Sequence, residues 1–295
     1  MNYYNKIKNK LIDNEVYCRV KDYSKERNTV ITYFEIGKLL NEAGGKYGDN
    51  IIDEYSKKLV KEVGKKYNRR TLFRMKQFYN IFNNEKVTTM WTQLSWSHIR
   101  LLFTLDAECI NYYIMITNKQ NISVRELDFK IKNKEYERLP LETRNKFITK
   151  EKLEIKDYVP NPILIKNKNK EKIITEKVLH NLILEDIGYF MKELGSSFSF
   201  IGSEYKIKIG DNYHKIDLLL FNIKYNSYVV VELKITEFKA EYISQVQKYM
   251  NYIDKRIKEI NNNSTIGIII CKKENKFVIE YCSDERIAIR KYELV

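Results

Sequence analysis

Two hydrophobic periodicities divide this chain. Up to about residue 146, apolar residues recur every three or four positions, as in Val30 to Leu40 and again in Ile51 to Val63, which predicts amphipathic helices. No proline occurs before Pro140, so nothing in the sequence forces a break in long helices. Residues 1–146 are therefore expected to form a helical domain.

A change of composition follows this helical half. Pro140, Pro160, Pro162 and the polar run 166–172 mark a boundary zone, because proline and polar clusters interrupt periodic segments. A chain of 295 residues is long enough for two domains with a core each. We expect a domain at 1–146, a linker at 147–172 and a second domain at 173–295.

The second half alternates strand-like and helix-like patterns. One helix is expected over 175–194, with Gly195 as its stop. The other expected elements are strands at 198–201, 205–209, 215–221 and 228–234, a helix at about 239–260, and strands at 265–271 and 276–281. This order predicts an α/β fold with a central mixed sheet flanked by helices.

Two acidic residues lie in stretches that otherwise have the composition of buried strands, within KIDLLLFNIKYNSYVVVELK. Asp217 opens one apolar run, Glu232 closes the next, and Lys234 follows. Burying an isolated charge costs several kcal/mol. If the two strands form a hairpin, the carboxylates converge, and a divalent cation between them would relieve their repulsion. A salt-bridged strand end is the alternative that spacing alone leaves open.

Mg²⁺ fits such a site, because it binds one or two carboxylates together with water and phosphate oxygens; Mn²⁺ would substitute for it. Lys234 has the same side-chain parity as Glu232 and could stabilise negative charge that develops during phosphate chemistry. Glu185 lies in the preceding predicted helix, where an exposed helix acid is the alternative. Gln245 and Tyr249 lie one turn apart on the following helix, where an ordinary helix face is the alternative.

Positive charge is concentrated in the first half. The net charge is +14, with 29 basic and 18 acidic residues in 1–150 against 24 and 21 in 151–295. This asymmetry favours a polyanion, above all nucleic acid, as the partner of the first half. A lysine-rich composition typical of an AT-rich genome explains part of the charge but not its uneven distribution.

The densest basic stretch is KKLVKEVGKKYNRRTLFRMK, residues 57–76. A helix, a break at Gly64 and a second helix from about Arg69 to Phe82 are typical of a helix-turn-helix or winged-helix element. A solvated helical face is the alternative. The residues expected to contact nucleic acid are Lys65, Lys66, Arg69, Arg70, Arg74 and Lys76.

The motif pattern resembles a known nuclease superfamily. A helical Glu, Asp-x14-Glu-x-Lys on strands, and Gln-x-x-x-Tyr on a helix resemble the PD-(D/E)xK nucleases. The string from Phe198 to Asp254 is similar to the C-terminal nuclease domain of the YhcG-like family, whose fold is restriction-endonuclease-like. WTQLSWSHIRLLF and LFRMKQFYNIF are similar to the N-terminal domain of that family.

This resemblance implies roles for the residues that match the motif. Asp217 and Glu232 would bind the metal together with the Leu233 carbonyl, and Lys234 would be the catalytic lysine. Glu185 would be the helical acid, with Gln245 and Tyr249 as the supporting motif. Ser203 and Glu204 stand where that family commonly has an Arg-Gln pair, so a phosphate contact there would fall to Lys206 or Lys208.

Other classes of protein fit the sequence less well. Four scattered cysteines without a C-x-x-C pair argue against a zinc site and for a reducing, cytoplasmic compartment. No signal peptide or run of about 18 apolar residues is present, so no membrane association is expected.

The expected function is Mg²⁺-dependent hydrolysis of phosphodiester bonds, in DNA rather than RNA, in defence, repair or a mobile element. The alternative is a nucleic-acid-binding or assembly module that keeps the nuclease fold, with no cleavage or with RNA as its target. The oligomeric state is open, with a homodimer as one option.

Overall fold

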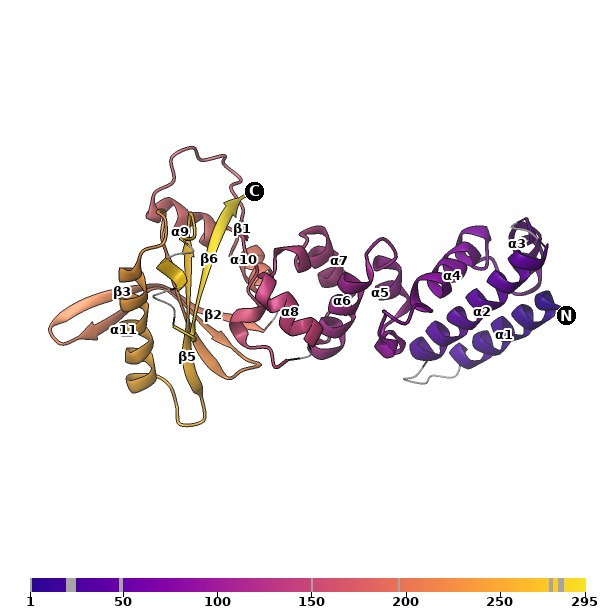
Figure 1. The fold of residues 1–295 in the computed structure, drawn as a ribbon, viewed down its shortest axis with the longest axis horizontal. Coiled ribbons are helices and arrows are strands. Elements are labelled where there is room, and N and C mark those ends of the chain that lie inside the picture. The colour runs from indigo at the N-terminus through magenta and orange to yellow at the C-terminus, as the bar shows by residue number, and fades with distance from the viewer. Residues whose placement is uncertain are drawn as a thin grey trace. The chain divides into compact units, whose positions relative to one another are not determined.

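The computed structural model describes residues 2–19, 25–47, 50–149, 151–195, 197–275, 278–280 and 284–295. The chain forms two compact units, Met1–Phe129 and Lys130–Val295. Figure 1 shows a helical first unit and a second unit built on a sheet. This confirms the expected fold class, a helical N-terminal part followed by a mixed sheet with flanking helices.

The first unit consists of helices. Their bounds are α1 Tyr3–Arg19, α2 Lys25–Tyr47, α3 Ile51–Glu62, α4 Arg69–Phe82, η1 Thr89–Gln93, α5 Trp96–Leu101, α6 Ala107–Gln120 and α7 Val124–Lys132, the last of which runs into the second unit. No strand occurs among the described residues up to Phe129, so the β wing of a winged-helix element is not seen there. The helix-turn-helix element itself stays a prediction.

Close packing of α2 on α4 holds this unit together. A Cβ on Gly37 would lie 2.1 Å from the backbone oxygen of Met75, so only glycine permits the observed approach of the two helices. Aromatic rings fill the space beside it: Trp91 lies 4.8 Å from the ring of Phe34 and 5.1 Å from that of Phe78. Trp91, which is only 6% exposed, is therefore a core residue.

The second unit contains a six-stranded sheet in the order β1-β6-β5-β4-β3-β2. The pairs β2–β3 and β3–β4 are antiparallel, and β4–β5, β5–β6 and β1–β6 are parallel. The bounds are η2 Tyr136–Arg138, α8 Leu141–Thr149, η3 Ile155–Tyr158, β1 Ile163–Ile165, α9 Glu176–Glu185, α10 Ile187–Leu194, β2 Phe198–Ile209, β3 Asn212–Asn222, β4 Ser227–Leu233, α11 Ala240–Arg256, β5 Asn263–Cys271 and β6 Ile287–Leu294.

Each face of the sheet packs against its own helices. On one face, Leu218, Leu220 and Val231 contact residues of α9 and α10. On the other face, Leu219 and Val230 contact residues of α11. Side chains that alternate along a strand point to opposite faces, which is why consecutive apolar residues in β3 and β4 are all buried. Asp217 in β3 and Glu232 in β4 are acidic exceptions within this covered sheet.

Three expectations for the second unit differ from the structure. The strands expected at 198–201 and 205–209 form one strand, β2 (Phe198–Ile209). The helix expected over 175–194 is two helices, because Asp186 leaves the helical conformation (φ −136°, ψ 54°) and its carboxylate caps the N–H of Tyr189 at 3.1 Å. The strand expected at 276–281 is wrong over 278–280, which are helical; residues 276, 277 and 281 lie outside the described residues. The last strand of the chain is instead β6, Ile287–Leu294, which lies between β1 and β5 in the sheet.

The segment expected as a linker, 147–172, contains structured elements. The apolar triplet Ile163–Ile165 forms β1 and pairs with the C-terminal strand β6 through Ile163 and Tyr292. A local pattern cannot reveal this pairing, because the partner lies over a hundred residues away in sequence. The bounds of independently folding domains stay a prediction.

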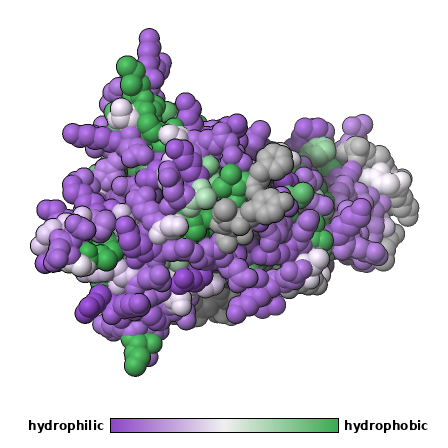
Figure 2. Space-filling model, turned by 60° about the vertical axis from the view of Figure 1, so that its left-hand side comes forward, coloured by the Kyte–Doolittle hydropathy of each residue, from purple (hydrophilic) through white to green (hydrophobic). Residues whose placement is uncertain are grey.

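The surface is mostly hydrophilic on the face drawn in Figure 2, with small, separate hydrophobic areas. The most exposed large apolar residues in the second unit, such as Ile173 and Ile260, lie far apart in sequence. Single exposed apolar residues are ordinary on protein surfaces. Within the described residues, no helix has both the length and the apolar run required to cross a membrane.

Candidate active site

The paired part of strands β3 and β4 ends beside two acidic side chains. Their antiparallel register pairs Leu218 with Val231, and the next position on each strand holds Asp217 and Glu232. Directly opposed residues of such a pair have Cβ atoms about 5 Å apart. The backbone N–H of Leu233 donates a 2.7 Å hydrogen bond to Oδ2 of Asp217, which fixes this carboxylate beside Glu232.

The carboxylate of Glu232 is held by two further predicted site residues. Its Oε1 atom accepts hydrogen bonds from Nζ of Lys234 at 2.7 Å and from Nε2 of Gln245 at 2.6 Å. The same amide nitrogen donates to the hydroxyl of Tyr249 at 3.1 Å. Glu232 is only 2% exposed, and its Oε2 atom is buried without a hydrogen-bond partner among the described residues. The structure thus brings Asp217, Glu232, Lys234, Gln245 and Tyr249 together.

Burial and mutual repulsion shape the charges of the pair. Burial, and then the nearby negative charge of Asp217, raise the pKa of Glu232 to about 7, although Lys234 acts in the opposite direction. Burial also raises the pKa of Asp217, against the lowering effect of the Leu233 N–H. Burial alone would lower the pKa of Lys234, but its bond to Glu232 raises it. The single positive charge of Lys234 therefore does not balance the two negative charges of Asp217 and Glu232.

This arrangement fits a small divalent cation. An unpartnered buried carboxylate oxygen is costly in a protein interior, and a cation would satisfy it. Asp217 and Glu232 supply hard oxygen atoms, and the Leu233 carbonyl is the third predicted ligand. No group of three or more His, Cys, Asp or Glu suited to a metal occurs in the part of the chain that the structure describes. Two carboxylates are nevertheless enough for Mg²⁺, which keeps several water ligands.

The helical acid predicted from the sequence lies away from this group. Glu185 is exposed at the C-terminal end of α9, and among the described residues no hydrogen bond or ion pair joins it to Asp217 or Glu232. Glu176, at the N-terminal end of α9, lies 3.9 Å from Nζ of Lys234. Glu185 lies nine positions after Glu176, which places the two acids on opposite sides of a helix. The acid that α9 brings to the site is therefore Glu176.

Two more residues near the site were missed from the sequence. Nε2 of His180, one turn after Glu176, lies 3.3 Å from the backbone oxygen of Asp217. Nζ of Lys234 lies 5.3 Å from the ring centre of Tyr242, whose hydroxyl is 2.7 Å from Oγ1 of Thr236. The spacing of one helical turn between Tyr242 and Gln245 was a usable signal, because such residues share a helix face.

The basic residues of the first unit have unequal surroundings. Arg69 forms an ion pair with Asp53 and packs on the ring of Phe73, and Lys66 pairs with Glu15 at 2.5 Å. These two charges are partly compensated within the unit. Of the remaining predicted contact residues, Lys65 and Arg70 are exposed, and Arg74 and Lys76 are half-buried.

Arginines gather on the neighbouring turns of α4 and α5. Burial, followed by the positive charges of Arg70 and Arg100, lowers the pKa of Arg74. Arg100 lies outside the basic stretch 57–76, and the fold brings it close to Arg74 from α5. Like charges that remain close together are a typical feature of anion-binding surfaces.

Two family models match this chain and together span most of it. Residues 156–295 match the model described as the YhcG PDDEXK nuclease domain. Residues 18–138 match the model described as the DUF1016 N-terminal domain. Among curated proteins, the "Putative nuclease YhcG" of Escherichia coli (strain K12) is 23% identical over 286 residues, which covers 82% of this chain and 76% of that protein.

Two solved structures are distantly similar. The crystal structure of a repair endonuclease from Pyrococcus abyssi matches with 18% identity and a TM-score of 0.30, over 41% of this chain and 48% of that chain. The structure of an EndoMS–dsDNA2 complex matches with 16% identity and a TM-score of 0.28, over 44% and 48%. The match spans about half of each of these two chains.

Proposed function

Because residues 156–295 belong to the YhcG PDDEXK nuclease domain family and residues 18–138 to the DUF1016 N-terminal domain family, we propose that this protein hydrolyses phosphodiester bonds with a divalent cation. The cation is Mg²⁺, with Mn²⁺ as a substitute, and the substrate is DNA rather than RNA. The setting is a cytoplasmic system of defence, repair or a mobile element.

One observation carries this proposal above the others. The buried Oε2 atom of Glu232 has no partner among the described residues, while Oε1 is held by Lys234 and Gln245. A structural salt bridge would satisfy both oxygens, because an unpaired buried oxygen has a large desolvation cost. A carboxylate that is oriented on one side and open on the other is suited to bind a metal ion.

The residues of the site have separate tasks. Asp217 and Glu232, with the Leu233 carbonyl, would hold the cation, which when bound polarises a phosphate and lowers the pKa of a water molecule. Gln245 fixes the orientation of Glu232, and its bond to Tyr249 fixes the amide in turn. Lys234 remains protonated, because its bond to Glu232 raises its pKa. It thus keeps a positive charge at the point where negative charge develops during hydrolysis.

The choice of DNA rests on charge and on family. The first 150 residues carry most of the net positive charge, with 29 basic against 18 acidic residues, and phosphate contacts supply most of the affinity for nucleic acid. DNA is also the commoner target of the superfamily that the chain resembles, which is an argument by analogy.

A cleavage assay with the purified full chain tests this function. Supercoiled plasmid, linear duplex, single-stranded DNA and RNA would be incubated with Mg²⁺, Mn²⁺ or EDTA. We expect cleavage of DNA with either metal and none with EDTA. Glu232→Gln and Asp217→Asn, purified in parallel, should lose at least ~100-fold in rate, because each removes a charged ligand.

The same assay separates the alternative. Binding of nucleic acid without cleavage of any substrate in either metal would favour a binding or assembly module with a nuclease fold. If both purified variants cleave at the wild-type rate, the assignment of the site is overturned.

A further inference from the structure

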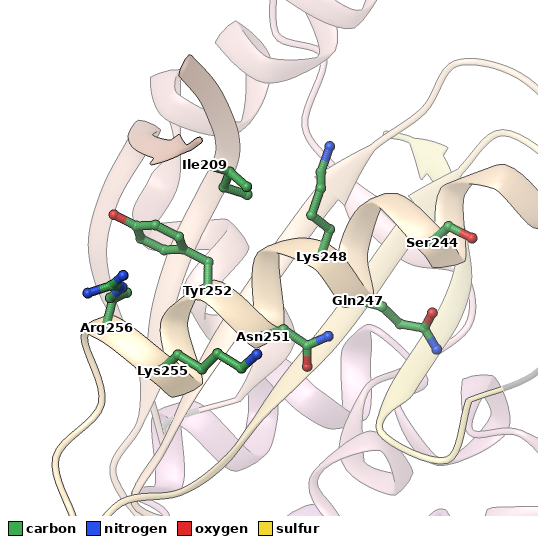
Figure 3. Close-up of a pocket in the computed structure, with 8 residues that line it drawn as sticks. All are labelled: Ile209, Ser244, Gln247, Lys248, Asn251, Tyr252, Lys255 and Arg256. Carbon is green, nitrogen blue, oxygen red and sulfur yellow. The ribbon is translucent and has the colours of Figure 1, made fainter. Parts of the chain in front are cut away.

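A groove lined mostly by polar and charged residues runs along the exposed side of α11, next to the helix residues that support the candidate active site. Its volume is about 450 Å³, and Figure 3 shows its lining residues projecting from successive turns of the helix, with Ile209 of β2 opposite Tyr252. The lining residues are Ile209, Ser244, Gln247, Lys248, Asn251, Tyr252, Lys255 and Arg256.

The charge of this groove is positive and largely uncompensated. Lys248, Lys255 and Arg256 are exposed, and none of them forms an ion pair with an acid in the described part of the chain. The acid that adjoins the groove is Asp284, which accepts a 2.7 Å hydrogen bond from Nε2 of Gln247 and lies 3.9 Å from Nε of Arg286. The three positive charges of Lys248, Lys255 and Arg256 therefore exceed the one negative charge of Asp284, which also faces Arg286.

The same helix connects the groove to the candidate active site. Gln245, which holds Glu232, lies in the same stretch of α11 as Ser244, Gln247 and Lys248. From Gln245 to Arg256 the helix rises by about 16 Å. A nucleic-acid duplex advances ~3.4 Å per base pair, so the groove is long enough to follow several consecutive phosphates that lead away from the site.

The helix is a rigid support for this surface. Val246, Met250 and Ile253, on its opposite side, are fully buried against the sheet. A Cβ on Gly267 of β5 would lie 2.5 Å from Cγ1 of Val246, so the helix lies as close to the sheet as a glycine allows. The groove and the residues that hold Glu232 therefore keep a fixed spacing.

We propose that this groove binds the phosphate backbone of the nucleic acid that is cleaved, so that the nuclease domain itself holds part of its substrate. The proposal rests on the proposed function and adds a binding site to it. Lys248, Lys255 and Arg256 neutralise phosphates, and the Ser244 hydroxyl and the Asn251 amide donate hydrogen bonds to the same oxygens. Contacts of this kind position a substrate without reading its sequence.

The test compares two triple variants of the full chain with the same change of charge. The groove variant is Lys248→Glu/Lys255→Glu/Arg256→Glu. The control is Lys152→Glu/Lys172→Glu/Lys272→Glu, three exposed lysines of the same unit outside the groove. Circular dichroism and thermal unfolding check that both variants fold. Fluorescence anisotropy with a labelled duplex in EDTA then measures Kd over a range of salt concentrations.

We expect the groove variant to bind at least tenfold more weakly at low salt, while the control changes by less than threefold. A plot of log K against log salt concentration should become less steep, with a slope smaller by up to about 2.7. Each lost phosphate contact with a duplex contributes about 0.9 to that slope. In Mg²⁺ the KM for cleavage should rise, with kcat at saturating substrate unchanged, because the groove does not touch the reacting atoms.

The outcomes separate this proposal from the proposed function. If the wild-type chain cuts DNA and the groove variant binds like the control, the groove proposal is overturned and the nuclease stands. If the wild-type chain cuts nothing but the groove variant alone loses binding, the groove stands as a nucleic-acid site and the nuclease fails. If a labelled poly-glutamate peptide binds the groove and the duplex does not, the partner is an acidic protein segment and our proposal is wrong.

Discussion

The side-chain amide of Gln245 donates a 2.6 Å hydrogen bond to Oε1 of Glu232 and leaves Oε2 of that carboxylate buried and unpartnered. The amide comes from α11 and the carboxylate from the end of β4. Their contact therefore sets the position of a strand residue from a helix that packs across the sheet. A support of this kind outside the ligand set commonly tunes metal affinity.

Gln245→Leu should weaken metal binding more than it slows chemistry. The leucine has a similar volume but cannot orient Glu232, so we expect the Mg²⁺ concentration for half-maximal cleavage to rise by about 10-fold or more, the range for loss of such a supporting bond. Rate measurements over a Mg²⁺ titration check this. Tyr249→Phe, which removes only an acceptor of the Gln245 amide, is the milder control. A lower maximal rate at an unchanged Mg²⁺ requirement would contradict this role.

The metal-free protein should become less stable as the pH rises through the range in which Glu232 ionises. Its pKa rises from 4.5 to about 7 on folding, so the folded state binds more protons than the unfolded state within this window. The free energy of unfolding contributed by this group is then greatest below pH 4.5 and is lost as the pH rises to about 7.

Urea unfolding of the wild-type protein and of Glu232→Gln in EDTA measures this contribution. Glutamine does not ionise, so the stability gained by the variant over the wild type should grow between pH 5 and about 7. Using the difference cancels groups that do not interact with Glu232, such as Asp186, whose lowered pKa acts in the opposite direction. A difference that stays constant with pH would show that Glu232 titrates normally.

Glu176 and Glu185 should behave differently on neutralisation. The negative charge of Glu176 contributes to the raised pKa of both Asp217 and Glu232. Glu176→Gln should therefore shift the acidic limb of the pH–rate profile for cleavage toward lower pH. Glu185→Gln should leave the profile unchanged, because this exposed residue lies on the other side of α9. A shifted profile for Glu185→Gln and an unchanged profile for Glu176→Gln would instead identify Glu185 as the helical acid of the site.

The arginines of α4 should not contribute equally to nucleic-acid binding. Arg70→Glu/Arg74→Glu should weaken duplex binding. The slope of log K against log salt concentration should also decrease in steepness by up to about 1.8, because each lost phosphate contact contributes about 0.9. Arg69→Ala should have a smaller effect, because this residue pairs with Asp53 and packs on Phe73. Anisotropy titrations over a range of salt concentrations check both variants, and an unchanged slope in the double variant would identify α4 as a merely solvated face.

A C-terminal fragment should fold well only if it begins well before residue 160. Glu193 is 2% exposed and forms an ion pair with Arg138, whose Nη2 atom lies 3.1 Å from Oε2. A fragment 160–295 leaves this buried carboxylate without its cation, which costs about 3–5 kcal/mol. A fragment 130–295 keeps the pair.

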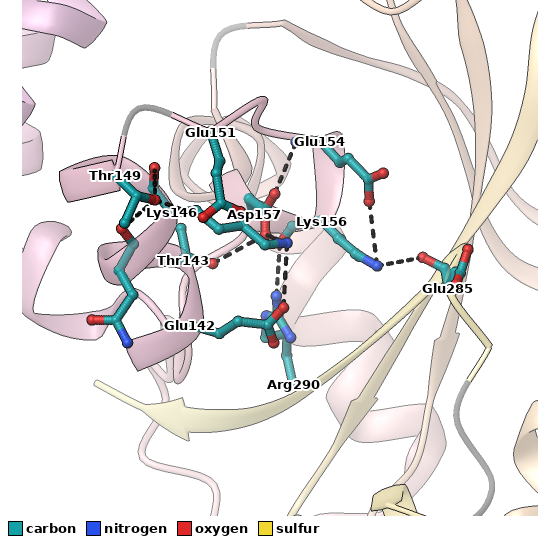
Figure 4. Close-up of polar contacts among 11 residues, drawn as sticks. Glu142, Thr143, Lys146, Thr149, Glu151, Glu154, Lys156, Asp157, Glu285 and Arg290 are labelled. Atoms are coloured by element: carbon teal, nitrogen blue, oxygen red, sulfur yellow. Dashed lines mark hydrogen bonds and ion pairs between the residues drawn. The ribbon is translucent and has the colours of Figure 1, made fainter.

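Further contacts before residue 160 support the same expectation. The guanidinium of Arg290 donates to the backbone oxygens of Lys156 at 2.6 Å and Val159 at 2.9 Å. Figure 4 shows Arg290 of β6 beside Lys156, which in turn reaches the backbone of Glu285 at 2.7 Å. In urea unfolding, the free energy of unfolding of fragment 130–295 should exceed that of fragment 160–295 by at least about 3 kcal/mol. Equal stabilities would mean that these contacts are replaced by water at no cost.

The central group of the site could be predicted from the sequence. Strand parity placed Glu232 and Lys234 on one face, and helical spacing placed Gln245 and Tyr249 on one side of α11, because both relations depend only on local backbone geometry. The antiparallel hairpin needed only the short turn between two apolar runs to bring Asp217 opposite Glu232. These are short-range relations, and the local string contains all the information that fixes them.

Long-range relations were decided by the tertiary structure. Strands β1 and β6 pair across more than a hundred residues, and no local pattern contains that partnership. The identity of the helical acid depends on how α9 is rotated against the sheet, and the break at Asp186 allows α9 and α10 to pack separately. The sequence by itself thus determined which residues form the acidic pair and its lysine and amide supports. Only the packing of helices on the sheet decided that Glu176 joins them and that the cations of α11 form a groove, because rotation about a helix axis is set by the surfaces that meet.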